Sequence, residues 1–583
     1  MCPMNPILLH SVTMYLQQRI PLAFLCASPE TRFAAEQRLL FTELNSENMD
    51  IENSGVVVGD AVVYIVNTAQ RLHRYIKLRH YTTREEKTLQ CMAWWLSRPI
   101  GEEEQLLPLS VLIECPVQKG KNALNVLFSL PGLVEVHFSQ CDNMTNSNAL
   151  ISLPSPRLPD LSSNAVIENG YLQFSHYHAL CDLSLAQCRG FTRLCGLPTA
   201  SSLHTIDLSF TSVNDDGILL LAESKSLRNV RLMGCVEITN VNAMARMITL
   251  ERLDLTSCGE LTNDGIAGLG KSNSLREVIL RYCKGITDVN SVTEAPSLLH
   301  LCVARSSLTQ SGIASIGSNN NNNNGMSLQH LDLTGCRGVK SVGHLACAVS
   351  LCSLDVSWAN VKRDALLGLI DSQCLEVLRI AGNPLRSISP LRHMQLLLDV
   401  DISDTNIGDD DIIVLATMKA LRHVTIRHCR HVTSINALAV LPALESIDVT
   451  SSAIVNAGIT ALNTAFSLTE LHLSHCKGIS IVSTLAECER LKILHLDGTQ
   501  VTDENITHLA GSRSLTEIDF SHCSQLSNIN TLATISTLRM VDVSFTGVTS
   551  DGCSALLRNS TIHIRGVLGL YAEGTPANKK STE

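Results

Sequence analysis

The chain contains few aromatic residues and no excess of positive charge. Phenylalanine, tyrosine and tryptophan make up 4% of the 583 residues, although hydrophobic residues reach 45%. Such a composition is unusual for a compact enzyme and is typical of cores packed from leucine. The net charge is −10 and the isoelectric point is near 6.1. The sequence therefore offers no broad basic surface for nucleic acid or an anionic membrane.

Long apolar segments are also missing. No apolar run approaches the ~20 residues that a membrane-spanning helix needs. The first residues lack a basic segment followed by an apolar stretch, so we expect no signal peptide. The 21 cysteines, without a secretory signal, predict reduced thiols in a cytoplasmic protein, with the nucleus as the alternative compartment.

The leucines and cysteines form a repeated pattern, L-x-x-L-x-L-x-x-C/T, which reads "LTEIDFSHC" from Leu515 and "LTELHLSHC" from Leu468. Its period, mostly 22–25 residues, is typical of leucine-rich repeats, in which each copy forms a strand, a turn and a return segment. Stacked copies bury one continuous core and form a solenoid. The 17 readable copies start at Leu133, Leu180, Leu203, Leu227, Leu250, Leu275, Leu298, Leu328, Leu351, Leu375, Leu397, Leu421, Leu444, Leu468, Leu491, Leu515 and Leu538. Weaker copies are expected near Leu109 and Leu158.

Two kinds of return segment alternate from Leu203 onward. In "TSVNDDGILLLA" (211–222) and "TQVTDENITHLA" (499–510), aspartates that cap the first turn and a period near 3.6 predict a helix. In "CKGITDVNSV" (283–292) and "CRHVTSINAL" (429–438), β-branched residues predict a tight turn with at most one helical turn.

Two segments resemble known repeat subfamilies. "CGELTNDGIAGL" (258–269) resembles the cysteine-containing leucine-rich repeats of F-box substrate receptors, and "GNPLRSISPL" (382–391) is similar to the shorter internalin type. The resemblance covers roughly residues 130–560. It implies an α/β solenoid with a curved parallel sheet on the concave face and short helices and turns on the convex face.

The ninth position of the repeat predicts structural rather than reactive thiols. Its side chain is expected to point inward, and catalysis would need one activated thiol instead of a ladder of them. The position holds cysteine in nine copies: Cys141, Cys188, Cys235, Cys258, Cys283, Cys336, Cys429, Cys476 and Cys523. We predict no cofactor and no catalytic residue.

Histidine precedes cysteine in three copies, as His428, His475 and His522. Equivalent residues two copies apart lie ~10 Å apart, whereas zinc needs each ligand within ~2.0–2.3 Å. These histidines therefore cannot share a metal ion, and no metal site is predicted. Because neighbouring strand residues point to opposite faces, we expect them to face outward, as solvated surface or as part of a binding face.

The concave face carries the candidate binding residues. Position five is acidic in eight copies: Asp207, Asp254, Asp332, Asp355, Asp401, Asp448, Asp519 and Asp542. These either keep the face soluble or attract a basic partner. Aromatic residues at position eight either pack on neighbouring side chains or anchor a partner. The predicted partner-binding residues are Trp358, Tyr282, Phe210, Asp332, Asp355, Phe545, His475 and His522, with Trp358 at the centre.

Residues 1–105 lack the clear repeat and are predicted to be helical, including 69–96, with a polar linker or loop at 42–56. Residues 5–41 resemble an F-box, which docks on a ubiquitin-ligase adaptor, through Pro6 and Leu8-Leu9. Asn5 departs from the F-box pattern, and a helical cap for the solenoid is the alternative. Residues 106–560 are assigned to the solenoid, and 561–583 to a C-terminal cap and disordered tail.

These features together predict a non-catalytic scaffold, monomeric, that binds a partner protein on the concave face of the repeats. The alternative is the substrate-recognition subunit of an SCF-type ubiquitin ligase, with a degenerate F-box at 5–41 and the same face binding the substrate.

Overall fold

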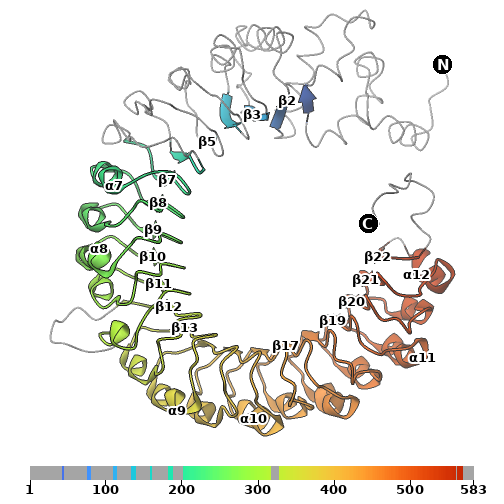
Figure 1. The fold of residues 1–583 in the computed structure, drawn as a ribbon. Helices are drawn as coiled ribbons and strands as arrows, with labels where there is room; N and C mark the ends of the chain where they lie inside the picture. Colours follow the sequence, from blue (N-terminus) through green and yellow to red (C-terminus); the bar gives the residue numbers. More distant parts are fainter. Residues whose placement is uncertain are drawn as a thin grey trace, which may run out of the picture. The chain divides into compact units, whose positions relative to one another are not determined.

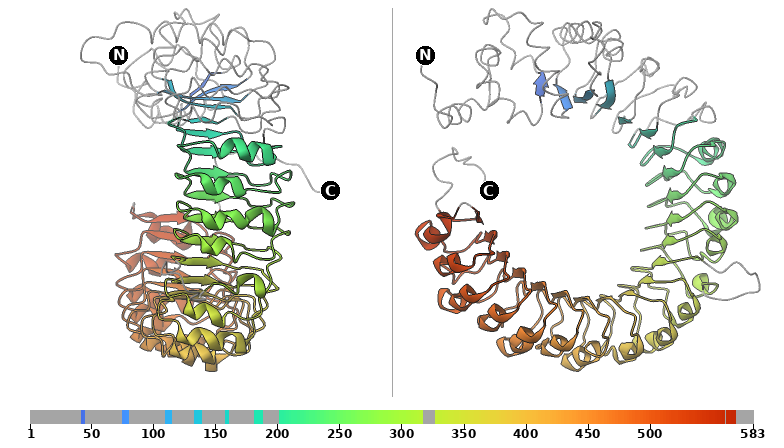
Figure 2. Two further views of the ribbon diagram at one scale, coloured as in Figure 1. Left: turned by 90° about the vertical axis from the view of Figure 1, so that its left-hand side faces the viewer. Right: turned by 180° about the vertical axis from the view of Figure 1, so that it is seen from behind.

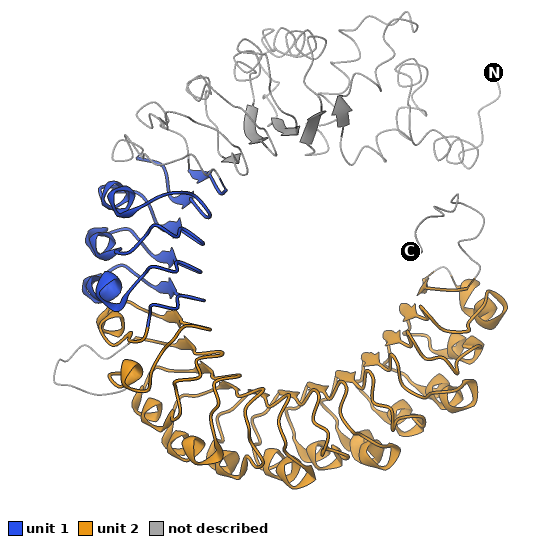
Figure 3. Cartoon of the chain, in the orientation of Figure 1, with its two compact units in different colours: residues 1–286 blue, residues 287–583 orange. Residues whose placement is uncertain are grey.

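The computed structural model (Figures 1 and 2) describes residues 181–187, 201–316, 327–559 and 561–568, together with the backbone of five earlier strands. The chain divides into two compact units, residues 1–286 and 287–583 (Figure 3). Each unit is built from the same repeat, and each is described separately.

The N-terminal unit holds ten described strands, each parallel to the next. They are β1 (Thr42–Leu44), β2 (Tyr75–Arg79), β3 (Leu109–Glu114), β4 (Leu133–Phe138), β5 (Leu158–Asp160), β6 (Asp182–Ser184), β7 (Thr205–Asp207), β8 (Asn229–Arg231), β9 (Arg252–Asp254) and β10 (Glu277–Ile279). The described return segments form α7 (Asp215–Leu221), η4 (Asn242–Arg246), α8 (Asn263–Ile266) and η5 (Ala267–Lys271), where η denotes a 3₁₀ helix.

The C-terminal unit continues the pattern with parallel strands β11 (His300–Cys302), β12 (His330–Asp332), β13 (Ser353–Asp355), β14 (Val377–Arg379), β15 (Asp399–Asp401), β16 (His423–Thr425), β17 (Ser446–Asp448), β18 (Glu470–His472), β19 (Ile493–His495), β20 (Glu517–Asp519), β21 (Met540–Asp542) and β22 (His563–Arg565). Within this unit the strands line the inner side of an arc and the helices and turns its outer side (Figure 1). This confirms the predicted repeat architecture.

The return segments of the C-terminal unit are short helices. They are η6 (Val292–Glu294), η7 (Ser311–Ile313), η8 (Gly343–Cys347), α9 (Arg363–Leu366), η9 (Leu367–Asp371), η10 (Ser389–His393), α10 (Asp409–Leu415), η11 (Asn436–Val440), η12 (Asn456–Thr464), η13 (Ser483–Glu487), α11 (Asp503–Ile506), η14 (Thr507–Gly511), η15 (Asn530–Thr534), η16 (Asp551–Cys553) and α12 (Ser554–Leu557). None of the helices among the described residues is both long enough and apolar enough to cross a bilayer.

Both predicted kinds of return segment are present. Helices α7 and α11 lie inside the two segments predicted to be helical. The segments predicted as tight turns lead only into the short 3₁₀ helices η6 and η11. The copy that starts at Leu444 is intermediate, because it returns through the nine-residue 3₁₀ helix η12.

The core is a stack of leucine layers. In the copy that starts at Leu491, the side chains of Leu491, Leu494 and Leu496 are fully buried, and the next layer repeats them at Leu515 and Ile518. Burying one such side chain contributes about 1.5–3 kcal/mol. The three-residue strands are therefore held mainly by the layers beneath them.

Strands in the region before residue 106 correct part of the helix prediction. Tyr75–Arg79 was expected inside a helix, but it forms β2 and pairs in register with β3. Ile76 and Leu78 alternate with Tyr75, Lys77 and Arg79, a period of two that suits a strand once a neighbouring strand supplies the backbone partners. Strand β1 likewise replaces part of the predicted loop. The weak copies expected near Leu109 and Leu158 are confirmed as β3 and β5.

The F-box-like segment 5–41 lies outside the described residues, as do Cys141, Cys188 and most of the remaining residues before 106. The prediction of an F-box or a helical cap therefore stays a prediction.

Candidate functional site

Position eight of each repeat is a turn with left-handed backbone geometry. In the described copies its φ angle lies between 56° and 70°, a range that side chains other than glycine rarely adopt. The residues are Gln187, Phe210, Gly234, Ser257, Tyr282, Arg305, Gly335, Trp358, Gly382, Asp404, His428, Ser451, His475, Gly498, His522 and Phe545. The predicted alternation of positions eight and nine assumed that both lie in a strand. Position eight lies instead in the turn that follows the strand.

The backbone of the next copy stabilises this turn. The N–H of Trp358 donates to the carbonyl of Ala381 at 2.7 Å, and the N–H of His475 donates to Asp497 at 2.7 Å. The parallel hydrogen-bond pattern thus extends past the ends of the strands. Within each unit it sets the side chains of position eight in a row along the strand ends.

The aromatic side chains in this row are exposed on one side and packed on the other. The exposed fraction is 47% for Phe210 and Tyr282, 51% for Trp358 and 77% for Phe545. Phe210 and Tyr282 belong to the N-terminal unit, and Trp358 and Phe545 belong to the C-terminal unit.

Glycine in the next copy makes room for a large side chain. A Cβ atom at Gly234 would overlap the ring of Phe210, and one at Gly382 would overlap the ring of Trp358. Gly498 leaves the same space for His475. The Trp358 ring is thereby held flat against the backbone while half of its surface stays open.

A hollow of about 540 Å³ lies beside Trp358 in the C-terminal unit. Trp358 supplies an aromatic surface, Asp404 a negative charge, and Arg430 a positive charge. The lining residues are Trp358, Asp404, Thr405, Asn406, His428, Arg430 and Ser451. The hollow thus combines an aromatic surface with both signs of charge. It does not include Asp332 or Asp355, which were predicted to act with Trp358.

The aspartates at position five have a structural role that the sequence analysis did not consider. Each accepts a hydrogen bond from the backbone N–H two residues later, at 2.8–3.0 Å, where the strand turns. The signal in the sequence is Asp-x-Ser/Thr, which occurs in all eight copies. Such side chain to backbone bonds are typical of aspartate in turns.

This role reduces the charge available to a partner. Asp448 is 6% exposed and is paired with Arg427 at 2.6 Å. Burial alone would raise the pKa of Asp448, but hydrogen bonds from Arg427 and Thr450 lower it. Burial raises the pKa of Asp355 despite the hydrogen bond from Ser357. The main role of the eight aspartates is therefore to stabilise the turn after the strand, rather than to present charge to a partner.

The cysteines at position nine are buried, as predicted. In all seven described copies that hold cysteine there, the thiol is 0% exposed and donates to a backbone carbonyl of the preceding copy, for example Cys476 to Val449 at 3.2 Å. Burial raises the pKa of Cys283 and of Cys476 to about 11. These thiols are the opposite of activated nucleophiles, whose pKa is lowered.

The predicted histidines are exposed, and each has a neighbour. His522 stacks on Phe545 with ring centroids 4.6 Å apart, and Nε2 of His475 lies 3.4 Å from a carboxylate oxygen of Asp497. His428 lines the hollow beside Trp358. The three residues belong to different copies, and the structure does not bring them to one point.

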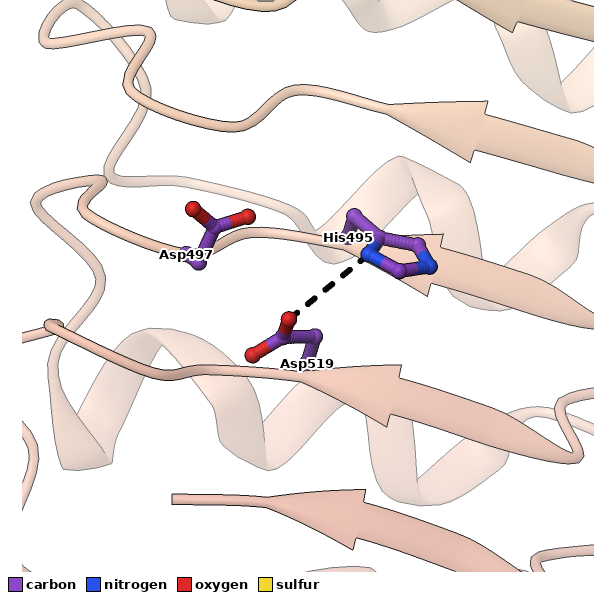
Figure 4. A group of neighbouring side chains, drawn as sticks. All are labelled: His495, Asp497 and Asp519. Atoms are coloured by element: carbon purple, nitrogen blue, oxygen red, sulfur yellow. Dashed lines mark ion pairs between the residues drawn. The ribbon is translucent and has the colours of Figure 1, made fainter. Parts of the chain in front are cut away.

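A group that the sequence analysis missed lies close to His475. His495 and Asp519 face each other from two adjacent copies, with Asp497 beside them (Figure 4), and the potential ligand atoms of all three lie within 4.8 Å of one another. His495 and Asp519 occupy position five and Asp497 position seven, whereas the histidines that were excluded as zinc ligands occupy position eight.

Comparison with known proteins identifies the fold. A family model described as "Leucine Rich repeat" matches residues 246–270, and no curated protein sequence matches the chain. Among solved structures, the chain is similar to one in the TLR13–ssRNA13 complex, with 17% identity, 87% of this chain and 79% of that chain covered, and a TM-score of 0.57. It is also similar to a chain of the mouse RP105/MD-1 complex, with 16% identity, coverage of 80% and 93%, and a TM-score of 0.51.

These matches show that the fold is a leucine-rich-repeat solenoid. An internalin from Listeria monocytogenes is 19% identical over 64% of this chain and 88% of that chain, with a TM-score of 0.39. That score is too low to support the predicted internalin-type copies. The F-box-receptor subtype also stays a prediction.

Proposed function

We propose that this leucine-rich-repeat protein is a non-catalytic scaffold that binds a partner protein at the hollow beside Trp358. The observation that carries the proposal is the pre-packed, half-exposed Trp358 ring at the edge of that hollow. An aromatic side chain that is already ordered loses little conformational entropy when a partner covers it. Tryptophan is also among the residues most enriched in binding hot spots.

The hollow favours a peptide segment that carries both polar and apolar groups. Arg430 and Asp404 offer partners of opposite charge, and Asn406 and Ser451 add hydrogen-bonding groups around the ring. Two similar folds occur in complexes, one with an RNA (TLR13–ssRNA13) and one with a second protein (RP105/MD-1). The mixed charge of this hollow and the net charge of −10 favour a protein over a nucleic acid.

The test is capture of partners by the full chain, compared with Trp358→Ala. A partner that occupies the hollow should bind Trp358→Ala about 30-fold more weakly, which corresponds to ~2 kcal/mol. Phe466→Ala is the matched control, because Phe466 is 66% exposed and lies outside the hollow. Partners that bind all three proteins equally would contradict the proposal, provided that the variants unfold at the same denaturant concentration.

The ubiquitin-ligase alternative is separable in the same experiment. It places the substrate on the same face and an adaptor on residues 5–41. A small acidic adaptor that survives Trp358→Ala but is lost with Leu8→Asp and Leu9→Asp would establish this role. If no such adaptor is captured by any of the proteins, the ubiquitin-ligase alternative is wrong and the scaffold function remains.

A further inference from the structure

We propose that His495, Asp497 and Asp519 form a binding site for a divalent transition-metal ion of the zinc type. The three residues come from copies that are adjacent in the C-terminal unit: His495 ends β19, Asp497 follows it in the turn, and Asp519 ends β20 (Figure 4). The site lies apart from the hollow beside Trp358, whose lining residues it does not share.

The spacing of the ligand atoms suits one ion. Nδ1 of His495 lies 3.7 Å from a carboxylate oxygen of Asp519, and all three ligand atoms lie within 4.8 Å of one another. Two ligands on one tetrahedral zinc ion lie about 3.4 Å apart, since each bond is about 2.0–2.1 Å long. Small side-chain movements of about 1 Å would bring the three atoms to that distance.

Each carboxylate is already oriented by the repeat scaffold. One oxygen of Asp519 accepts the backbone N–H of Ser521 at 2.8 Å, and its other oxygen faces His495. One oxygen of Asp497 accepts the hydroxyl of Ser474, and its other oxygen faces His475. Metal sites characteristically hold their ligands through such outer hydrogen bonds.

The histidine is held as well. The ring of His495 stacks on that of His472, with centroids 4.5 Å apart and an interplanar angle of 21°. The side chains of the three candidate ligands are only 17–26% exposed. His495 and Asp519 therefore already face each other before an ion binds, whereas the Asp497 carboxylate, which contacts Ser474 and His475, has to turn toward the ion.

The site also departs from the pattern of the array. Position five is aspartate in eight copies, but it is histidine in three, at His137, His472 and His495. Position seven is aspartate only at Asp497 among the 17 copies. These exchanges place an imidazole and two carboxylates together at one point of the sheet edge.

The donor set determines the class of ion. Imidazole nitrogen is a ligand for zinc, copper and nickel, whereas magnesium and calcium prefer sites made only of oxygen. With a neutral histidine the two carboxylates carry two negative charges, which a divalent cation neutralises. Nε2 of His475 lies 3.4 Å from a carboxylate oxygen of Asp497, which places a further potential ligand next to the site.

The test is zinc binding by the full chain after accessible thiols have been blocked with N-ethylmaleimide. Titration with zinc chloride against a chromophoric chelator should show one equivalent bound to the wild-type protein. That equivalent should bind at least tenfold more weakly to His495→Phe and to Asp519→Asn. His495→Phe keeps a ring to stack on His472, and Asp519→Asn keeps an oxygen for the Ser521 N–H, so both variants should retain the fold.

His508→Ala is the matched control, because His508 lies in the same copy but is exposed in η14. It should bind the same equivalent of zinc as the wild-type protein. The proposal is wrong if wild type, variants and control bind zinc alike, if the wild-type protein binds none, or if it binds calcium or magnesium in preference to zinc.

Discussion

Large side chains occupy a left-handed backbone position in this protein, and two contacts make that geometry stable. For residues other than glycine, left-handed geometry costs roughly 1–2 kcal/mol. At Trp358 the cost is offset by the hydrogen bond to Ala381 and by packing of the ring on Gly382. The position therefore couples backbone geometry, contact between copies and an exposed aromatic surface.

Gly382→Ala should lower the free energy of unfolding by about 2–3 kcal/mol. Gly382 has a φ angle of +65°, and an added Cβ would overlap the Trp358 ring. Gly511→Ala is the control, because an added Cβ there meets nothing within 4 Å. Denaturant unfolding of both variants measures the difference. Equal stability of the two variants would contradict the packing described for Trp358.

The buried thiols should make stability depend on alkaline pH. Burial raises the pKa of Cys476 from 9.0 to about 11. Between these values the unfolded chain loses the proton while the folded chain keeps it, so the free energy of unfolding falls as the pH rises. Cys476→Ser should reduce that fall by about 1–3 kcal/mol.

Serine is a suitable replacement because Ser452 occupies the same position in its own copy and donates to Ile426 at 2.6 Å. The measurement is denaturant unfolding at pH 7 and pH 11. Cys347→Ser, at an exposed thiol, should behave like the wild-type protein. If Cys476→Ser loses as much stability as the wild-type protein over this range, Cys476 is not buried as a thiol.

At the scale of the elements, adjacent copies are tied together by the return segments as well as by the strands. Asp503 begins α11 and accepts hydrogen bonds from the backbone of Ser527 and Asn528 and from the Ser527 hydroxyl. Asp215 and Asp409 make the same set of bonds to the copies that follow them. The predicted helix-capping role belongs instead to Asn214 and Thr502.

Asp503→Ala should lower the free energy of unfolding by about 1–2 kcal/mol, because three donors of the next copy lose their acceptor. Glu504→Ala is the control: it removes a charge from the same first turn, but no hydrogen bond to the next copy. Its effect should stay within about 0.5 kcal/mol.

The difference in free energy of unfolding between Asp503→Ala and the wild-type protein should also depend on pH. Burial opposes the shift, but hydrogen bonds from Ser527 and Asn528 lower the pKa of Asp503 below 3.8. The stabilisation by Asp503 is therefore present above that pH and is lost as the pH falls through the lowered pKa. A difference between Asp503→Ala and the wild-type protein that does not shrink as the pH falls below 3.8 would contradict the assignment.

The elements were predictable where a leucine layer defines them. Leu491, Leu494 and Leu496 fix the strand and its buried face, and Cys476 was correctly placed inside. The geometry of Trp358 was not predictable in the same way, because bulky residues rarely adopt left-handed backbone angles. Contacts with the next copy impose that geometry. Strand β2 was missed because its backbone partners lie in another segment of the chain.

The candidate sites were also predictable only in part from the sequence. Trp358 was identified from its scarcity and its position in the repeat, and the structure adds the hollow lined by Asp404 and Arg430. The group of His495, Asp497 and Asp519 was missed because only equivalent positions were compared between copies. Its residues occupy different positions, which approach one another only when the turn after β19 is known.

For the molecule as a whole, the low aromatic content has a structural explanation. The leucine layers need few rings, and the largest fully buried side chain among the described residues is Phe520. The other aromatic residues in the described part of the chain are exposed, and four of them, Phe210, Tyr282, Trp358 and Phe545, share one position of the repeat. The exposed aromatic side chains at this position are the basis of the proposed binding face.

Hydrogen exchange of the full chain with and without its captured partner tests the central claim most directly. If the partner occupies the hollow, peptides that cover residues 404–406 and 428–430 should exchange more slowly in the complex. Peptides from the return helices α9 and α11 should be unchanged. Protection confined to the return helices, with no change at 404–406 and 428–430, would contradict binding beside Trp358.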